Sequence, residues 1–210
     1  DELYLNAIYF GRPIEREGLL YEENELRRYF TLPDKEPDAI LAICDTKEQG
    51  LDYCVCPIFY QYGTDFYLDD IICDNSKVEV LEERVAQILV SRKVRMCRFE
   101  SNRGGSIFAK NVEKRVKELG GFTSITTKWT QSNKETRIHA SAGTAKSHIL
   151  FLDKDAKGYT KEYQTAMNQL CTYSIAGKNK HDDVADVLAM FVDMIASSDV
   201  NTAVVMHRPF

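Results

Sequence analysis

The sequence predicts an α/β domain built on one mixed sheet, in which a three-strand antiparallel meander is joined to parallel strands and flanked by helices. Two observations lead to this prediction. Three apolar, strand-like runs between residues 39 and 74 are separated only by short polar turns, which is typical of consecutive antiparallel strands. After them, amphipathic helical segments alternate with further short apolar runs. With 210 residues, the chain is long enough for one domain with a substantial core.

The meander begins with AILAICD, residues 39–45, a continuous apolar run of the kind that forms a strand buried on both faces. TKEQG follows as a turn, and DYCVCPIFYQY, residues 52–62, is expected to be the second strand. The dipeptide GT turns the chain again before the third strand, DFYLDDIICD, at residues 65–74. Because both connections are short, we expect the three strands to be antiparallel neighbours.

An amphipathic helix and a short strand follow the meander. The helix is VEVLEERVAQILVSR, residues 78–92, and its apolar side chains expected to face the core are Val80, Val85, Ile88 and Leu89. The run RMCRFE, residues 95–100, is expected to be a strand that ends at Glu100.

The rest of the chain alternates helices and strands. A helix over residues 106–121 closes at Gly120 and Gly121, since glycine suits the left-handed conformation that follows many helices. Further elements are expected in this order: a strand in FTSITTKWT (122–130), a helix in SNKETRIHASAGTAKSH (132–148), a strand in HILFL (148–152), a helix in TKEYQTAMNQLCTY (160–173), and a last helix in HDDVADVLAMFVDMIASS (181–198).

The first 34 residues differ in pattern from the rest. They read as helical and then irregular up to Pro33, and we interpret residues 1–34 as a lead-in rather than core. Residues 35–210 then form the folded domain. Because the chain begins with Asp1 instead of Met, we expect it to be a domain cut from a longer polypeptide.

The charge, the cysteine spacing and the lengths of the apolar runs disfavour several classes of function. The net charge of −5 argues against a strong general affinity for nucleic acid, so any such role must depend on local basic patches, a metal or a partner domain. The six cysteines lack C-x-x-C spacing, which disfavours a zinc site and favours reduced core thiols in an intracellular setting. No apolar run approaches the roughly 20 residues of a membrane span, so no membrane partner is expected.

Acidic residues lie at the ends of three predicted elements. Asp45 ends the first strand of the meander, and Glu100 ends the fourth strand. In open α/β sheets, sites gather outside the carboxyl ends of strands, so these two side chains converge if their strands are parallel neighbours. A helix start nearby would bring Asp183 to the same point.

The last helix opens with the adjacent aspartates Asp182 and Asp183 and has a third at Asp186. At about 100° per residue, Asp183 falls in line with Val187 and Met190, at the edge of the buried stripe. Asp182 and Asp186 fall on the flank away from the centre of that stripe. A carboxylate turned toward the core is costly unless it is paired or binds a metal, so the position of Asp183 is the one that needs an explanation.

Carboxylate oxygens are ligands that hard cations such as Mg²⁺ prefer. We interpret Asp45, Glu100 and Asp183 together as a site for two cations, about 3.5–4 Å apart, that clamp the attacking and leaving oxygens of a phosphodiester. Each of these residues taken alone is more often a turn or cap residue. The metal hypothesis therefore depends on the three occurring together.

Several motifs resemble one protein family over nearly the whole chain. They are ICDTKEQGLDY, a strand ending in FESNRGG, then NKETRI, then KHDDVADVLAM. This combination resembles the nuclease domain of the large terminase subunit of tailed bacteriophages, and the opening IYFGRPIEREGLLYEENELRRYF is similar to the junction that follows the ATPase domain in those proteins. HDD-x-x-D at a helix start is the more specific motif, and ESN-x-GG after a strand is moderately specific.

The resemblance implies an RNase H-like fold, close to RuvC resolvases, and an endonuclease that cuts concatemeric double-stranded viral DNA when packaging starts and ends. It implies two Mg²⁺ or Mn²⁺ ions as cofactors and the cytoplasm of an infected bacterial host as the location. The implied partners are double-stranded DNA, an ATPase domain of the same polypeptide, the small terminase subunit and the portal protein. No Walker sequence occurs in this chain, so it would cut DNA without packaging it.

Carried over by motif, the catalytic and metal-binding residues are Asp45, Glu100 and one aspartate of HDDVAD. The motif leaves Asp182 and Asp183 as alternatives, and the helix-face argument selects Asp183. Other residues of the motifs are candidates for supporting the ligands or contacting DNA: Asp182, Asp186, Arg103, Lys134, Arg137, Lys178 and Lys180.

Two other interpretations fit the same sequence. The chain could be another RNase H-like enzyme, such as a junction resolvase or a transposase core, which would share the metal site and differ in substrate. It could instead be a catalytically silent DNA-binding or docking module, which would keep the fold and hold no metal.

Overall fold

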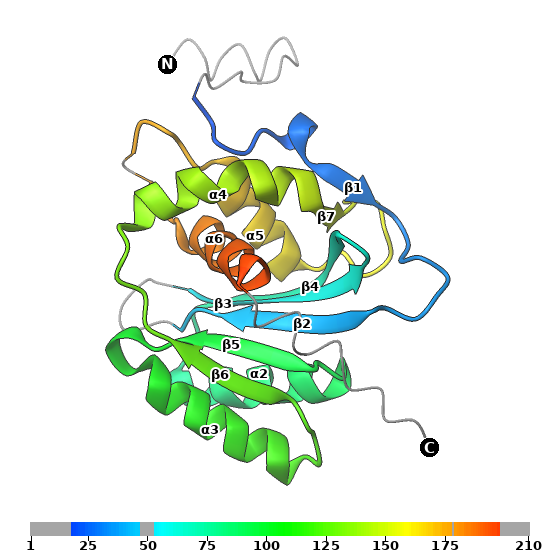
Figure 1. Ribbon diagram of the computed structural model, residues 1–210, viewed down its shortest axis with the longest axis vertical. Coiled ribbons are helices and arrows are strands. Elements are labelled where there is room, and N and C mark those ends of the chain that lie inside the picture. The colour runs from blue at the N-terminus through cyan, green and yellow to red at the C-terminus, as the bar shows by residue number, and fades with distance from the viewer. Residues whose placement is uncertain (1–17, 47–52, 178, 198–210) are drawn as a thin grey trace.

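A seven-stranded mixed sheet forms the centre of the computed structural model, which describes residues 18–46, 53–177 and 179–197. The strands lie in the order β1-β7-β4-β3-β2-β5-β6 (Figure 1). Their bounds are Arg27–Tyr29 (β1), Ala39–Cys44 (β2), Cys54–Tyr62 (β3), Asp65–Asp74 (β4), Met96–Glu100 (β5), Ser124–Lys128 (β6) and Ile149–Leu152 (β7). The predicted mixed sheet is confirmed.

Strand directions also follow the prediction. β2, β3 and β4 pair antiparallel as consecutive neighbours, which confirms the meander. β5 pairs parallel with β2, and β6 pairs parallel with β5. On the other side, β7 pairs parallel with β4, and β1 pairs parallel with β7. The carboxyl ends of β2 and β5 therefore lie side by side at one edge of the sheet.

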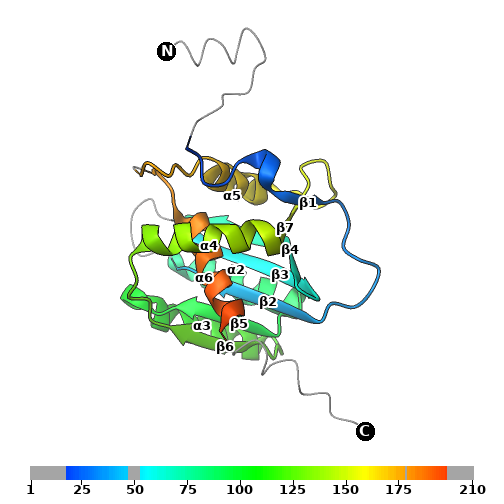
Figure 2. The same cartoon turned by 45° about the horizontal axis from the view of Figure 1, so that its top comes forward.

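Helices cover both faces of the sheet and enclose two apolar cores (Figures 1 and 2). One face carries α2 and α3, and the other carries α4, α5 and α6. Among the described residues, no helix has the length and apolar character needed to cross a bilayer. The helix bounds are Val78–Ser91 (α2), Gly105–Glu118 (α3), Lys134–His148 (α4), Lys161–Cys171 (α5) and Asp183–Ala196 (α6), and two short 3-10 turns occupy Glu23–Glu25 and Asn102–Gly104.

The buried face of α2 differs from the prediction at one position. Val80 is 48% exposed, and Leu81 is buried in its place. Leu81, Val85 and Leu89 are spaced by four residues and form the stripe that packs on the sheet. Val80 lies about 100° away from Leu81 around the helix, which turns it toward solvent.

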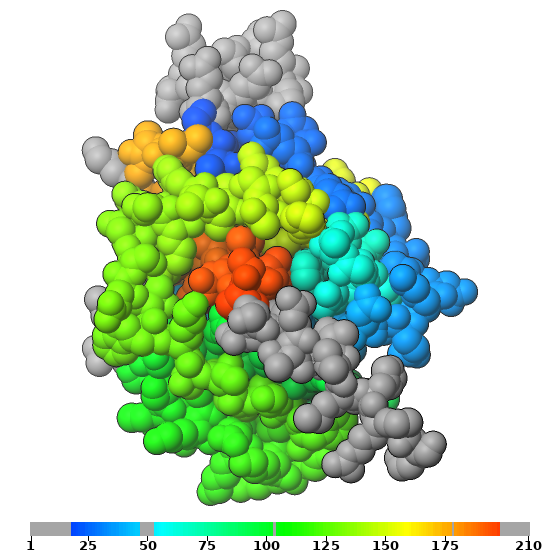
Figure 3. All heavy atoms as spheres, in the orientation of Figure 1, coloured from blue at the N-terminus to red at the C-terminus, as the bar shows by residue number. Residues whose placement is uncertain are grey.

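The helix α6 lies between the sheet and α4. Every side chain from Asp183 to Phe191 is buried, and the ring of Phe191 stacks on Phe59 of β3 with 3.7 Å between centroids. In the space-filling view, the orange-red end of α6 reaches the surface between the yellow-green atoms of α4 and the cyan atoms of the β3–β4 hairpin (Figure 3). The burial of residues 183–191 holds α6 against the sheet from its first residue onward.

Residues 18–34 differ from the expected lead-in outside the core. Tyr21, Leu26 and Tyr29 are buried in the core that α4, α5 and α6 share with the sheet. Tyr29 donates its hydroxyl hydrogen to the carbonyl oxygen of Leu68 at 2.9 Å. These apolar residues are separated by charged ones in LLYEENELRRYF, so neither a helical nor a strand period was visible in the sequence.

Candidate active site

Asp45 and Glu100 lie at the ends of neighbouring parallel strands, as predicted. Asp45 follows β2 directly, and Glu100 is the last residue of β5. The register pairs Cys44 with Phe99, so the next residue of each strand lies at the same level. Asp45 is fixed there by two backbone hydrogen bonds with Val55 of β3, both 3.0 Å long.

The first residue of α6 completes the group. Asp183 is 9% exposed, and its Oδ2 accepts a hydrogen bond from the backbone N–H of Tyr53 at 3.4 Å. The predicted inward orientation of Asp183 is confirmed. A cavity of about 390 Å³ contains all three predicted carboxylates, and its lining is Asp45, Thr46, Tyr53, Glu100, Asn102, Trp129, Thr130, Ser132, Lys134, Arg137, Asp183 and Asp186. We call it the acidic cavity.

The carboxylates in the acidic cavity repel one another. Burial raises the pKa of Asp45 well above its ordinary value, and the negative charges of Glu100 and Asp186 raise it further. The positive charge of Lys134 acts in the opposite direction. An ionised Asp45 at neutral pH is therefore unfavourable, unless more positive charge comes close to it.

The prediction that Asp186 lies on a flank away from the core is wrong. Asp186 is 2% exposed, and both of its oxygens accept hydrogen bonds from Arg137 of α4, at 2.7 Å each. The helix α4 packs over the flank of α6 that the periodicity had assigned to solvent. A second helix in the same layer cannot be read from the pattern of a single helix.

The amine of Lys134 lies among the aspartates of α6. Its Nζ is 2.7 Å from Asp182, 3.5 Å from Asp186 and 3.7 Å from Asp183. Burial disfavours the charge of Lys134, but the hydrogen bond to Asp182 and the attraction of the other aspartates outweigh burial and raise its pKa. Lys134 and Arg137 together neutralise much of the negative charge on the start of α6.

The predicted DNA-contact residues are not all in one place. Lys134 and Arg137 line the acidic cavity, and both pair with carboxylates inside the protein. Lys180 is exposed in the loop before α6. Lys178 and the side chain of Arg103 lie outside the described residues.

Asn102 is a residue of this site that sequence reasoning missed. Its Nδ2 donates hydrogen bonds to Glu100 Oε1 at 2.9 Å and to the carbonyl oxygen of Thr130 at 3.1 Å. Its Oδ1 is buried and has no hydrogen-bond partner among the described residues. The ESN-x-GG motif contained the signal, because an amide two residues after the acidic residue can reach back to it.

Asn102→Ala is expected to lower cleavage activity by about 10–100-fold, the usual range for residues that orient a metal ligand. The physical reason is that Glu100 would lose the amide that fixes its carboxylate. Cleavage rates measured over a range of Mn²⁺ concentrations would show a higher metal requirement. Unchanged rates at limiting Mn²⁺ would contradict the role of Asn102.

Gly105, the first residue of α3, packs tightly against the end of β5. A Cβ atom at this position would lie 1.9 Å from the carbonyl oxygen of Glu100 and 3.3 Å from the hydroxyl of Thr46. The absence of a side chain at Gly105 lets α3 start directly behind Glu100.

Gly105→Ala is expected to destabilise the protein by about 1–3 kcal/mol, because the added methyl must separate α3 from β5. Thermal melting is the measurement. Gly143→Ala is the matched control: Gly143 lies inside α4 with nothing within 4 Å of the new methyl, so that variant should gain about 0.5–1 kcal/mol. Similar melting temperatures for the two variants would contradict the close packing.

The donor set fits a divalent cation, although it is not assembled as a chelate. Among the described residues, no group of three or more His, Cys, Asp or Glu side chains is close enough to hold an ion as it stands. Hard oxygen donors nevertheless converge on the acidic cavity from three elements, and a cation near Asp45 and Glu100 would relieve their repulsion. Asn102 offers a further buried oxygen beside them.

Asp45→Asn is expected to raise the melting temperature in EDTA at neutral pH, since it removes a buried charge. A folded-state pKa above the unfolded value means that stability is lost as the pH rises through that range. The gain from Asp45→Asn should therefore shrink as the pH falls toward 3.8, the ordinary pKa of the side chain. Thermal melts over a pH series test this, with the exposed Asp155→Asn as control. A gain that is the same at every pH would contradict the explanation.

Comparisons with known proteins agree with the fold. No protein-family model and no curated protein sequence matches this chain. The human cytomegalovirus terminase nuclease domain, soaked with manganese and bound to an inhibitor, matches with a TM-score of 0.61 at 11% identity, over 88% of this chain and 97% of that chain. The nuclease domain of the large terminase subunit of bacterial virus Sf6 matches with a TM-score of 0.51 at 12% identity, over 75% and 89%. This chain has the fold of a terminase nuclease domain.

The terminase nuclease fold confirms the RNase H-like arrangement that the resemblance implied. A third match is the large terminase of a thermophilic bacteriophage, with a TM-score of 0.55 at 12% identity. That match covers 84% of this chain and 44% of the phage protein, so the present chain corresponds to less than half of that large terminase.

Proposed function

We propose that this domain is a metal-dependent endonuclease that cuts concatemeric double-stranded viral DNA during genome packaging, in the cytoplasm of an infected bacterium. The observation that carries the proposal is that Asp45, Glu100 and Asp183 come from three separate elements and line one cavity. The likeness of the fold to terminase nuclease domains supports the same function. Manganese in the cytomegalovirus structure supports a divalent cofactor.

Asp45, Glu100 and Asp183 would hold two Mg²⁺ or Mn²⁺ ions in the acidic cavity. When bound, such ions lower the pKa of the attacking water and stabilise the leaving oxygen of the phosphodiester. Asn102 orients Glu100 through its amide. The carboxylates at the start of α6 are held in place by Lys134 and, through Asp186, by Arg137.

The negative charge at the start of α6 affects how a DNA phosphate can approach the site. An uncompensated group of aspartates would repel the DNA backbone. Lys134 and Arg137 offset that charge from α4, so we assign them to the site as supports for the aspartates as well as candidates for phosphate contact. Lys178, Lys180 and Arg103 remain candidates for contacts further along the DNA.

The likeness to a longer phage terminase supports a wider assembly. In this proposal the domain follows an ATPase domain of the same polypeptide, and it works with the small terminase subunit and the portal protein. The net charge of −5 makes binding to DNA by this domain alone weak and sensitive to salt. The other parts of the assembly would then deliver the DNA.

Incubation of the domain with supercoiled plasmid and millimolar Mn²⁺ tests the function. We expect nicked and linear products with little sequence preference, and no cleavage when EDTA is present. Intact plasmid at high enzyme concentration would contradict the proposal and favour a DNA-binding or docking module without catalytic activity. A four-way junction supplied beside a linear duplex distinguishes a resolvase, which would cut the junction preferentially.

A further inference from the structure

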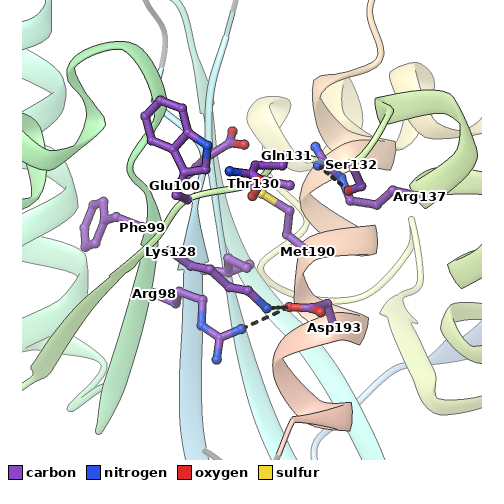
Figure 4. A pocket seen from close by; sticks show the side chains of 12 residues that line it. Arg98, Phe99, Glu100, Lys128, Thr130, Gln131, Ser132, Arg137, Met190 and Asp193 are labelled. Carbon is purple, nitrogen blue, oxygen red and sulfur yellow. Dashed lines mark hydrogen bonds and ion pairs between the residues drawn. The ribbon is translucent and has the colours of Figure 1, made fainter.

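A second cavity, of about 250 Å³, lies next to the acidic cavity along β5 (Figure 4). The two cavities share Glu100, Trp129, Thr130, Ser132 and Arg137 as lining residues, so they adjoin each other. We call the second one the side cavity. Arg98 and Glu100 are two residues apart on β5, and their side chains therefore project from the same face of the sheet. Arg98 lines the side cavity, and Glu100 lines both cavities.

The side cavity is lined by three positive side chains, Arg98, Lys128 and Arg137, and by two negative ones, Glu100 and Asp193. Arg98, whose side chain is almost fully buried, donates to Asp193 of α6 and to Ser197, at 3.3 Å each. Lys128 of β6 reaches the same carboxylate of Asp193 at 2.5 Å. Figure 4 shows both cations converging on Asp193 below Glu100. Arg98 and Lys128 thus line a cavity directly beside the carboxylates that would cut the phosphodiester.

The remaining lining of the side cavity is partly apolar and partly polar. Met190 and Ile43 contribute apolar side chains, and Thr130, Gln131 and Ser132 contribute polar ones. Its volume is below the about 300–1,000 Å³ of pockets that enclose drug-sized ligands, so it is too small for a duplex.

Trp129 stands where the two cavities meet. It follows β6 directly, lines both cavities and is 61% exposed. It is also the one tryptophan in the sequence. Aromatic side chains beside a cationic groove are the usual means of holding single-stranded nucleic acid, because every base can stack on them.

From these observations we infer that an unstacked base of the cleaved strand enters the side cavity and stacks on Trp129, while the half-exposed Lys128 lies beside the adjacent phosphate. The inference rests on the proposed nuclease function and deepens it. A base leaves the duplex more readily where pairing is already weak. The site would consequently prefer DNA that is locally unpaired next to the cut.

The fluorescence of Trp129 reports directly on such stacking. In EDTA, where no cleavage is expected, the protein is titrated with a duplex that has a central unpaired stretch, with a fully paired duplex of the same length, and with deoxyadenosine monophosphate. We expect saturable quenching by the duplex with the unpaired stretch at the lowest concentration. Equal quenching by the mononucleotide at the same concentration would overturn a site for a DNA strand, as would no quenching by any of the three.

Variants at Trp129 separate stacking from general binding. Trp129→Ala should weaken binding of the partly unpaired duplex by about 5- to 100-fold, measured by anisotropy of labelled DNA, and Trp129→Phe should keep most of the affinity. The matched control is Phe122→Ala, which removes an 80% exposed aromatic residue that does not line either cavity. Because Trp129 is largely exposed, its variants should melt at the temperature of the unmodified protein.

The base-stacking site and the nuclease function can be disproved separately. If Trp129→Ala binds and cleaves as the unmodified protein does, the base-stacking site is wrong while the nuclease function stands. If no variant cleaves DNA with Mn²⁺, yet the tryptophan is quenched selectively by unpaired DNA, the binding site stands and the nuclease function fails. Equal loss of affinity in Trp129→Ala and Phe122→Ala would also overturn the stacking site.

Discussion

Asp183→Asn is expected to lower DNA cleavage by more than about 100-fold, because it removes an anionic ligand and not merely a residue that orients one. Asp182→Asn should retain most of the activity. The two residues are adjacent, yet Asp183 lines the acidic cavity, while the side chain of Asp182 is about one third exposed and pairs with Lys134. An ion pair of that exposure contributes about 0–1 kcal/mol. Plasmid cleavage with Mn²⁺ measures both variants.

Folding must be checked beside activity for these two variants. Both should melt within a few degrees of the unmodified protein in EDTA, since neither removes a fully buried pair. An inactive Asp182→Asn together with an active Asp183→Asn would show that the preceding residue is the ligand and that the helix-face argument is wrong. Mn²⁺ titration by calorimetry gives an independent readout, in which only Asp183→Asn should lose binding.

Arg137→Ala is expected to destabilise the protein by about 3–5 kcal/mol, because it leaves the buried carboxylate of Asp186 without its two hydrogen bonds. At about 2–4 °C for each kcal/mol in a protein of this size, the melting temperature should fall by about 6–20 °C. The pair joins α4 to α6 directly beside the acidic cavity, so its loss should loosen the start of α6 as well. Thermal melting in EDTA measures the effect.

The control for Arg137 lies on the same helix. Lys146 of α4 pairs with Glu25 at 2.7 Å, but this pair is much more exposed, and Lys146→Ala should cost about 0–1 kcal/mol. The double variant Arg137→Ala with Asp186→Asn should recover part of the loss, since it removes the buried charge that would otherwise keep only Lys134 as its partner. A melting temperature for Arg137→Ala equal to that of Lys146→Ala would show that the buried pair does not stabilise the fold.

Much of the fold could be predicted from sequence because its signals are local. Short turns between apolar runs predict the meander. Apolar runs that alternate with helices predict the parallel strands. β1 could not be predicted in the same way. It has three residues, and its place in the sheet depends on pairing with β7, more than a hundred residues away in the chain.

The sequence also predicted which three carboxylates of the candidate site lie together. Strand ends placed Asp45 and Glu100 together, and one helical period placed Asp183 toward them. The environment of Asp186 was not predictable, because its burial comes from α4 and not from α6 itself. The side cavity is also lined by residues of α6, β5 and β6 together, an arrangement that no motif in the sequence predicts.

The pairing of β1 with β7 also affects how the domain can be isolated. Residues 27–29 cover one side of β7, whose four side chains Ile149–Leu152 are all buried. A fragment that starts at residue 35 would expose the backbone donors and acceptors of this apolar strand to solvent. Unprotected strands of that kind pair with other chains and aggregate. The short β1 therefore protects β7 from pairing with other chains. A domain expressed on its own should keep residues 18–34.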